Sequence, residues 1–128
     1  MVRPGRLGRL EEADAPESAV RPFEIWWAEL PKPAGRRPVL LLTRPRGYHY
    51  LSRVLVAEVT TTVRGIPQEV ALSKREGMGR SCVVNLDNVQ AIPKRWLAAV
   101  AGQLAPSRHV EVKRALGHAL GWIELTAL

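Results

Sequence analysis

Four arginines bracket a short apolar segment in the stretch GRRPVLLLTRPR, which begins at Gly35. Arg36 and Arg37 precede the segment VLLL, and Arg44 and Arg46 follow it. A guanidinium group stays charged at neutral pH and can hold two oxygens of a phosphate at once. Such groups therefore suit the binding of a phosphodiester and the stabilisation of the charge that develops in a pentacoordinate phosphorane.

Hydroxyl and amide side chains farther along the chain can complement the arginines. These groups bond phosphate oxygens or the edges of nucleobases, although most such residues at strand ends are simply solvated. The candidates are Thr60, Ser81, Asn85, Asn88 and Gln90. The aromatic side chains that can stack on a base are Trp26, Trp27, Tyr48 and Tyr50. Adjacent strand residues point to opposite faces, so we expect one of the two tryptophans in the core and the other at the surface.

Standard catalytic and metal-binding patterns are missing from the sequence. His109 and His118 are nine residues apart in a predicted helix and therefore lie on opposite faces. The chain has one cysteine and no close cluster of His, Asp or Glu, which argues against a zinc or two-metal site. The segment GMG at Gly77 matches no phosphate-binding loop. We therefore expect no metal and no cofactor, and any catalysis to proceed without a Ser-His-Asp triad.

The composition is that of one globular domain with an anionic partner. The 128 residues are 46% hydrophobic and carry a net charge of +7, with an isoelectric point of about 10.5. Residues 1–21 contain four arginines and four carboxylates, so the whole positive excess belongs to residues 22–128. A strongly basic domain favours nucleic acid as the partner, although many basic domains are simply soluble.

The cytoplasm is the location that the sequence favours. Cys82, the only cysteine, lies in the apolar run CVV, so no disulfide can form within the chain and a buried thiol is expected. No apolar run approaches the roughly 20 residues of a membrane span. The basic N-terminus is followed by acidic residues rather than by the apolar core of a signal peptide. We therefore expect no contact with a membrane.

Turn residues divide the chain into a flexible extension, residues 1–21, and a single domain, residues 22–128. The extension lacks apolar periodicity, whereas the domain begins with short segments rich in β-branched and aromatic residues. Five strands are predicted, at 24–30, 38–43, 53–61, 69–73 and 81–86. The turn sequences between them, such as PKPAG and GMG, favour a small, strongly curved antiparallel barrel.

The last third of the domain changes from strand to helix periodicity. Pro93–Leu97 is predicted to form a helical turn with proline at its first position. A helix that faces the core is predicted after the sequence APS at Ala105. Its apolar residues at helical spacing are Val112, Leu116, Ala119 and Leu120. The expected fold class is therefore α+β, mainly β, with a C-terminal helix on the antiparallel barrel.

The order of these segments resembles that of a known family. The sequence EIWWAEL is followed in turn by GRRPVL, VAEVT, IPQEVAL and SCVVNLDN. From about residue 23 to residue 121, this succession resembles the MazF/PemK (Kid) toxins of bacterial type II toxin–antitoxin systems. No single motif is decisive, but five motifs in this order are specific.

The resemblance implies a homodimer of SH3-like barrels that cleaves single-stranded RNA (messenger, ribosomal or transfer RNA) without a metal and so arrests growth. In this reaction the ribose 2′-hydroxyl attacks the adjacent phosphate and leaves a 2′,3′-cyclic phosphate and a 5′-hydroxyl end. A cognate antitoxin is the implied protein partner. The arginine of the family's Arg-Pro-Val motif matches Arg37, and the threonine that closes the third strand matches Thr60. The resemblance therefore makes these two the expected catalytic residues.

Other polar residues are expected to bind the RNA. Arg36 neighbours the expected phosphate site, and Arg44 and Arg46 open the next loop, where they would steer or grip RNA. The predicted RNA-binding residues are Arg36, Arg44, Arg46, Arg64, Ser81, Asn85, Asn88 and Gln90. Relatives more often have Gln and Arg where this chain has Asn88 and Gln90, so the resemblance leaves the recognised bases open.

Two other functions remain open at this point. One is an SH3-like RNA-binding module without catalytic activity, which would keep the basic face but would not need the pair Arg37 and Thr60. The other is a gyrase inhibitor like the CcdB toxins, which have a C-terminal end of the Trp-Gly-Ile type. Here Gly121 precedes Trp122 and five residues follow Ile123, so this match is poor.

Overall fold

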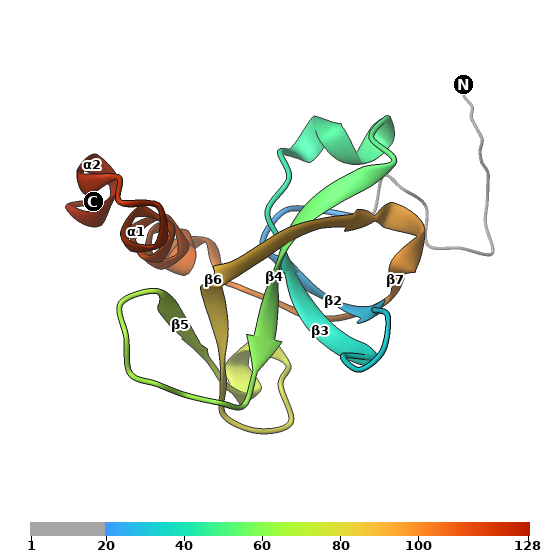
Figure 1. The fold of residues 1–128 in the computed structure, drawn as a ribbon, viewed down its shortest axis with the longest axis horizontal. Coiled ribbons are helices and arrows are strands. Elements are labelled where there is room, and N and C mark those ends of the chain that lie inside the picture. Colours follow the sequence, from blue (N-terminus) through green and yellow to red (C-terminus); the bar gives the residue numbers. More distant parts are fainter. Residues whose placement is uncertain (1–19) are drawn as a thin grey trace.

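A computed structural model describes residues 20–128, which form one curved antiparallel sheet with helices at one end (Figure 1). The strands are β2 (Glu24–Glu29), β3 (Arg36–Leu41), β4 (Arg53–Thr60), β5 (Glu69–Leu72), β6 (Cys82–Pro93) and β7 (Leu97–Gln103). The helices are α1 (His109–Leu120) and α2 (Ile123–Thr126), together with 3₁₀ turns at Pro45–His49, Lys74–Glu76, Lys94–Trp96 and Pro106–Arg108. The predicted extension, residues 1–21, lies almost wholly outside the described residues.

The strand order β5-β6-β4-β3-β2-β7 confirms the expected fold class, mainly β with a C-terminal helix. Strands β5 and β7 form the edges of the sheet, so within residues 20–128 hydrogen bonds do not close it into a complete barrel. All five predicted strands are present, and β6 continues seven residues beyond the predicted end at Leu86. Strand β7 is not predicted from its sequence, LAAVAGQ, because alanine and glycine have low strand propensity. It pairs with the outer edge of β2.

The sheet buries side chains on both faces. One face holds a cluster that contains the register partners Ile25, Leu40 and Ala57, and α1 contributes Val112 and Ala115 to it. The other face holds a second cluster, which includes Trp26, Val39, Val56 and Tyr48. Trp26 is therefore the core tryptophan, and both it and Tyr48 are buried too deeply to stack on a base. Trp27 is half-buried and Tyr50 is exposed, so these two remain available.

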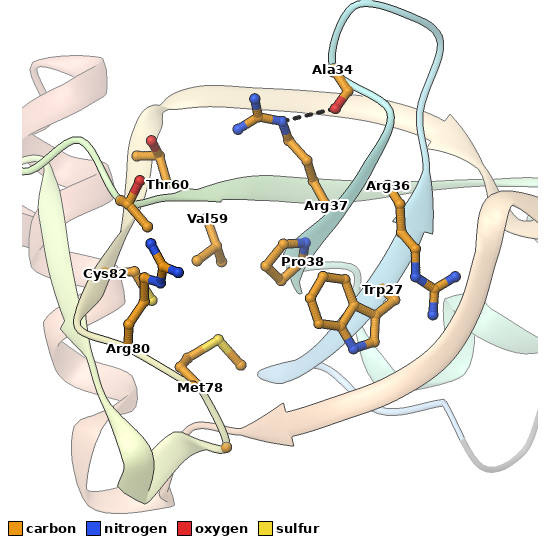
Figure 2. A pocket seen from close by; sticks show the side chains of 13 residues that line it. Trp27, Ala34, Arg36, Arg37, Pro38, Val59, Thr60, Met78, Arg80 and Cys82 are labelled. Carbon is orange, nitrogen blue, oxygen red and sulfur yellow. Dashed lines mark hydrogen bonds between the residues drawn. The ribbon is translucent and has the colours of Figure 1, made fainter.

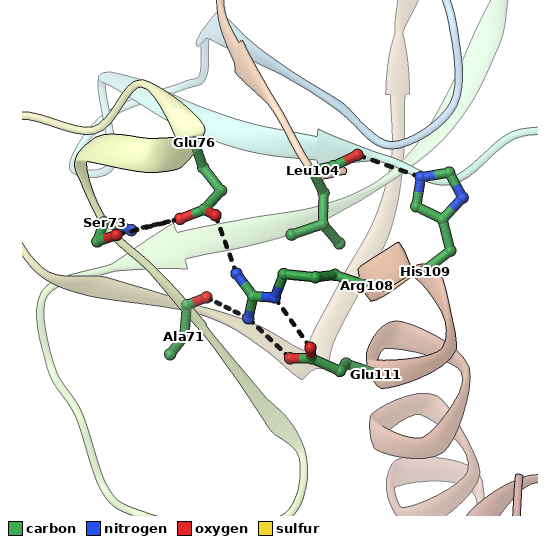
Figure 3. A network of polar contacts seen from close by, with 7 residues as sticks. All are labelled: Ala71, Ser73, Glu76, Leu104, Arg108, His109 and Glu111. Atoms are coloured by element: carbon green, nitrogen blue, oxygen red, sulfur yellow. Dashed lines mark hydrogen bonds and ion pairs between the residues drawn. The ribbon is translucent and has the colours of Figure 1, made fainter. Parts of the chain in front are cut away.

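Arg108 joins α1 to the body of the domain (Figure 3). Its Nη1 donates to Glu76 Oε2 at 3.0 Å, its Nη2 donates to the carbonyl of Ala71 at 2.8 Å, and Nε and Nη2 both donate to the Glu111 carboxylate. Glu76 is only 5% exposed, and its Oε1 also accepts a hydrogen bond from the backbone N–H of Ser73 at 2.7 Å. The hydrogen bond from Arg108 lowers the pKa of the Glu111 carboxyl. This network fixes the 3₁₀ turn Lys74–Glu76 and the start of α1 relative to each other.

Two glycines allow the same turn to cross β7 closely. A Cβ atom on Gly102 would lie 1.7 Å from the carbonyl oxygen of Glu76, and one on Gly77 would lie 2.4 Å from the carbonyl oxygen of Ala101. Gly77 also has a φ of +92°, which side chains other than glycine rarely adopt. The crossing directs the chain after Gly77 toward the open ends of β3 and β4.

Among the described residues no helix is long and apolar enough to cross a membrane.

Candidate active site

The pairing of β3 with β4 brings Arg37 and Thr60 together. The antiparallel register aligns Val39 with Glu58, and each step along one strand is matched by a step back along the other. The paired positions end there, but this register carried on by two residues puts Arg37 level with Thr60, and both residues line the same two pockets. Because side chains alternate along a strand, both point to the same face as Glu58, and Figure 2 shows them on one side of the strands.

A backbone carbonyl, and not a carboxylate, orients the side chain of Arg37. Its Nε donates a hydrogen bond of 3.1 Å to the carbonyl oxygen of Ala34, in the β2–β3 turn (Figure 2). That turn is closed by a hydrogen bond from Leu30 N–H to the carbonyl of Gly35, whose φ of +67° favours glycine. Within the described part of the chain Arg37 has no carboxylate partner, so both terminal nitrogens and the full positive charge remain available to a ligand.

Thr60 presents a hydroxyl whose proton is free to donate. The Oγ1 atom accepts a hydrogen bond of 3.1 Å from the backbone N–H of Thr62. The oxygen is thereby occupied as an acceptor, and the O–H group can donate outward to an anion. A cation and a hydroxyl donor thus line the same two pockets at the ends of β3 and β4.

Two pockets meet at Arg37 and Thr60. The Trp27 pocket, of about 470 Å³, is lined by Trp27, Ala34, Arg36, Arg37, Pro38, Val59, Thr60, Thr61, Gly77, Met78, Gly79, Arg80 and Cys82. The Asn88 pocket, of about 380 Å³, is lined by Pro33, Ala34, Arg37, Glu58, Thr60, Thr62, Arg64, Asn85 and Asn88. Strand alternation puts Pro38 and Val59 on the face opposite Glu58, so the two pockets open on opposite faces of the β3–β4 pair.

The Trp27 pocket combines an apolar floor with a basic rim. Trp27 and Met78 contribute large apolar surfaces, and Arg36 lies over the Trp27 ring at 5.3 Å from its centroid. Arg36 also forms an ion pair with Glu29, so part of its charge is already neutralised. Burial, and secondly the charge of Glu76, raise the pKa of the Cys82 thiol. Cys82 is buried, as its sequence context predicts, and a raised pKa disfavours the reactive thiolate form.

The Asn88 pocket is shaped by an irregular segment of β6. Ala57 of β4 pairs with Val89, but Val59 pairs with Val84, so Glu58 alone opposes the four residues 85–88. Such a bulge redirects side chains, and here it brings Asn85 and Asn88 to the pocket wall. The Asn85 Oδ1 atom accepts a hydrogen bond of 2.9 Å from the backbone N–H of Asp87, which stabilises the bulge and leaves the amide N–H groups as donors.

The loop that carries Arg64 is anchored by a carboxylate. Glu69 accepts hydrogen bonds from the backbone N–H groups of Arg64, at 3.1 Å, and Gly65, at 3.0 Å. The Arg64 side chain lines the Asn88 pocket, so this anchor places a second positive charge there. The charge of the pocket therefore comes from Arg37 and Arg64, opposed by Glu58.

The structure brings together six of the ten predicted site residues and separates four. The six that line one or both pockets are Arg36, Arg37, Thr60, Arg64, Asn85 and Asn88. Arg44 and Arg46 lie at the opposite end of β3, where Arg44 stacks on and bonds Tyr50. Ser81 is exposed beside the Trp27 pocket without lining it, and Gln90 reaches the Asn88 pocket only through a hydrogen bond to Glu58.

The pocket residues that are not predicted from the sequence include Glu58, Met78 and Arg80. Met78 and Arg80 reach the site through the glycine-assisted crossing of β7, which involves residues far apart in sequence. Glu58 carries a signal that sequence reading could have used, because it lies two residues before Thr60 on the same strand.

No metal site accompanies these residues. Among residues 20–128 no group of three or more His, Cys, Asp or Glu side chains is arranged to hold a metal ion. His109 has a structural environment, stacked on Phe23 with ring centroids 3.7 Å apart and with its Nε2 at 3.2 Å from the Leu104 carbonyl. The chemistry that this site supports is charge stabilisation by Arg37 and Thr60.

Sequence comparisons place residues 21–120 within the family model described as a PemK-like, MazF-like toxin of type II toxin–antitoxin systems. Endoribonuclease MazF3 of Mycobacterium tuberculosis is 40% identical over 106 residues, which cover 81% of this chain and 98% of that protein. Probable endoribonuclease MazF5 of the same species is 41% identical over 86 residues, covering 66% of this chain and 78% of that protein.

Solved structures with the same fold carry related names. The Mycobacterium tuberculosis toxin MazF-mt6 matches with a TM-score of 0.72 and 38% identity, over 77% of this chain and 96% of that chain. A mycobacterial endoribonuclease in complex with its cognate antitoxin also matches with a TM-score of 0.72, at 26% identity, over 81% of this chain and 97% of that one.

Proposed function

This chain belongs to the PemK-like, MazF-like family of type II toxins, and from that premise we propose that Arg37 and Thr60 form the site at which it cleaves single-stranded RNA. It is a toxin endoribonuclease, in keeping with its relatives, which are named endoribonuclease MazF3 and probable endoribonuclease MazF5. The observation that supports this site is that Arg37, which has no carboxylate partner in the described chain, and the hydroxyl donor Thr60 line the same two pockets.

The proposed reaction is a transesterification within the RNA. The ribose 2′-oxygen forms a bond to the adjacent phosphorus and gives its proton to solvent. The bond from phosphorus to the 5′-oxygen breaks, and that oxygen takes up a proton from solvent. A 2′,3′-cyclic phosphate and a 5′-hydroxyl end result, so the reaction needs neither an oxidant nor an added group.

Arg37 and Thr60 stabilise the charge that builds up during this step. The two terminal nitrogens of Arg37 donate to the non-bridging phosphate oxygens, and the Thr60 hydroxyl donates to one of them. Because the Ala34 carbonyl already accepts a hydrogen bond from Nε, the guanidinium group is ordered before the reaction begins. A guanidinium group keeps its proton near neutral pH, so Arg37 acts by its charge and not as a base.

The pockets on either side hold the nucleotides that flank the cleaved bond. The apolar floor and Trp27 of one pocket suit a stacked base. The amides of the other, Asn85 and Asn88, suit hydrogen bonds to a base edge. Since the phosphate bound at Arg37 lies between the pockets, one neighbouring nucleotide enters each of them.

The partners proposed for the chain are a second copy of itself, RNA and a cognate antitoxin in the cytoplasm. A mycobacterial relative of the same fold is described in complex with its cognate antitoxin. Large apolar side chains are exposed near the C-terminus, among them Trp122 at 51% and Ile123 at 79%. Such side chains support a protein interface. Sedimentation of the full chain, alone and with the antitoxin, measures both associations.

The test of the cleavage is an incubation of the full chain with single-stranded RNA in EDTA. We expect cut products with 2′,3′-cyclic phosphate and 5′-hydroxyl ends, and their loss in Arg37→Ala. Arg46→Ala is the matched control, since it removes the same charge away from both pockets. RNA that is bound but never cut would point to the RNA-binding module instead. Equal cutting by Arg37→Ala would remove Arg37 from the active site.

A further inference from the structure

Glu58 is an unexpected group in a site that receives a polyanion. Of the residues that line the two pockets, it alone carries a carboxylate. A negative charge beside the RNA backbone weakens binding through repulsion. Such a charge is compatible with RNA binding where it faces the donor groups of a base and not the phosphates.

The carboxylate of Glu58 is oriented before any ligand binds. Gln90 Nε2 donates a hydrogen bond of 2.8 Å to Glu58 Oε2. Glu58 is two residues before Thr60 on the same face of β4, which places their Cα atoms roughly 7 Å apart along the strand. A phosphate held at Thr60 would therefore have its neighbouring nucleotide beside Glu58, in the Asn88 pocket.

We propose that Glu58 selects a guanine at the nucleotide that enters the Asn88 pocket. Guanine carries two adjacent donors, N1–H and the N2 amino group, and a carboxylate can accept from both at once. Adenine and cytosine each place a ring acceptor beside their single amino donor, and uracil places its N3–H between two carbonyl oxygens. With those three bases, one carboxylate oxygen of Glu58 faces a lone pair and repels it.

The other side chains of the pocket complement the acceptor side of guanine. Its O6 and N7 atoms accept hydrogen bonds, and arginine and amide groups are their usual donors. Arg64 and Asn88 line the pocket, and Asn85 keeps its amide N–H groups free because its Oδ1 is bound to Asp87 N–H. One carboxylate and several donors thus match the two edges of a single base.

This assignment rests on the proposed function, and the experiment separates the two. The full chain is incubated in EDTA with a single-stranded RNA of random sequence, and the cut ends are sequenced for the wild type, Glu58→Gln and Glu124→Gln. Glu124→Gln removes a negative charge from the exposed α2 helix and serves as the control. We expect guanine at one of the two nucleotides that flank the cut in the wild type and the control, and a roughly ten- to hundredfold weaker preference in Glu58→Gln.

A second arm replaces that guanine with inosine, which lacks the 2-amino group. Cleavage by the wild type is expected to fall about tenfold, in keeping with one lost hydrogen bond to a charged group. Glu58→Gln is expected to cut both RNAs at similar rates. Gln90→Ala, which frees the carboxylate without removing it, is expected to weaken the preference for guanine by a smaller factor.

Binding tests the same idea without cleavage. Fluorescence anisotropy with Arg37→Ala, alone and combined with Glu58→Gln, compares one oligonucleotide carrying guanine with its inosine analogue. Failure of the wild type to cut any RNA would refute the proposed function, and the anisotropy arm would still test the role of Glu58. An unchanged base preference in the Glu58→Gln variants overturns the proposal. So does a loss of cleavage that is equal for all sequences, which would mean that the carboxylate acts in catalysis or in folding.

Discussion

Two arginines of this domain, Arg37 and Arg108, are placed in opposite ways. Arg108 donates to two carboxylates, those of Glu76 and Glu111, and to a backbone carbonyl. Arg37 donates to one backbone carbonyl and has no carboxylate partner within residues 20–128. The charge of Arg108 is therefore neutralised within the fold, while that of Arg37 is left for a ligand.

The difference lies in what orders each side chain. A carboxylate orders an arginine and also cancels its field, which suits the attachment of α1 to the sheet. A neutral carbonyl such as that of Ala34 restricts the guanidinium and leaves its charge intact, which suits phosphate binding. The substitutions below test whether one arginine acts in catalysis and the other in stability.

The largest effect is expected for Arg37→Ala on activity. The variant loses a donor aimed at developing charge, so kcat should fall on the order of 10²- to 10³-fold. Its free energy of unfolding should stay within about 0.5 kcal/mol of the wild type, because only one hydrogen bond to a surface turn is lost. Single-turnover cleavage and urea titration measure the two quantities. A strong loss of stability would place Arg37 with Arg108 among the structural residues.

Arg108→Ala is expected to produce the converse result. Glu76 would be left as a buried charge without its partner, which should lower the free energy of unfolding by about 2–3 kcal/mol. This value is below that of a fully buried pair because a quarter of the Arg108 side chain is exposed. Lys113→Ala, an exposed change on the same helix, is the control for urea titration.

A double variant sharpens this result. Adding Glu76→Gln to Arg108→Ala removes the uncompensated charge, so part of the lost stability should return. No recovery would mean that the contacts of Arg108 with Glu111 and Ala71, and not the charge of Glu76, hold the helix.

A smaller effect on activity is expected for Thr60. Thr60→Val keeps the shape of the side chain but removes a hydrogen bond to a charged phosphate, so cleavage should slow by about tenfold. Thr60→Ser keeps the hydroxyl and should retain most of the rate. Equal rates for the two variants would show that the hydroxyl does not touch the reacting phosphate.

The smallest expected effect is the dependence of stability on pH. The hydrogen bond from Arg108 lowers the pKa of Glu111 in the folded state. The contribution of this contact to the free energy of unfolding is therefore fully present above the unfolded pKa of roughly 4.3. That contribution is lost as the pH falls through the lower, folded value. The stability difference between wild type and Arg108→Ala should therefore shrink below about pH 4, as measured by urea titration at several pH values. A constant difference would remove Glu111 from the network.

Several features of the fold follow from local sequence. Strands β2 to β6 are predicted because β-branched and aromatic runs are separated by Pro- and Gly-containing turns. Helix α1 is predicted because its apolar residues recur at helical spacing, and Val112 is indeed buried, whereas Leu120 is 49% exposed beyond the edge of the core. Strand β7 has no such local signal and forms because β2 offers it an unpaired edge.

The candidate site also has a part that the sequence predicts and a part that only the structure shows. Order of motifs and residue type single out Arg37 and Thr60 as candidates, and net charge favours a nucleic acid partner. The same sequence reasoning places Arg36, Arg44 and Arg46 together among the RNA-binding residues, because all three flank one apolar run. The structure separates them, since a strand about six residues long carries its two ends to opposite sides of the domain.

By itself, the sequence determined strands β2 to β6, the helix, the basic charge and the chemical groups from which a phosphate site can be built, because these depend on short-range spacing and side-chain type. Only the tertiary structure decided which groups meet: Arg37 with Thr60, Glu58 with the β6 bulge, and Arg108 with Glu76. The physical reason is that strand register, burial and ion pairing join residues far apart in the chain. In the structure these interactions pair Arg108 with two carboxylates and leave Arg37 with only a backbone carbonyl.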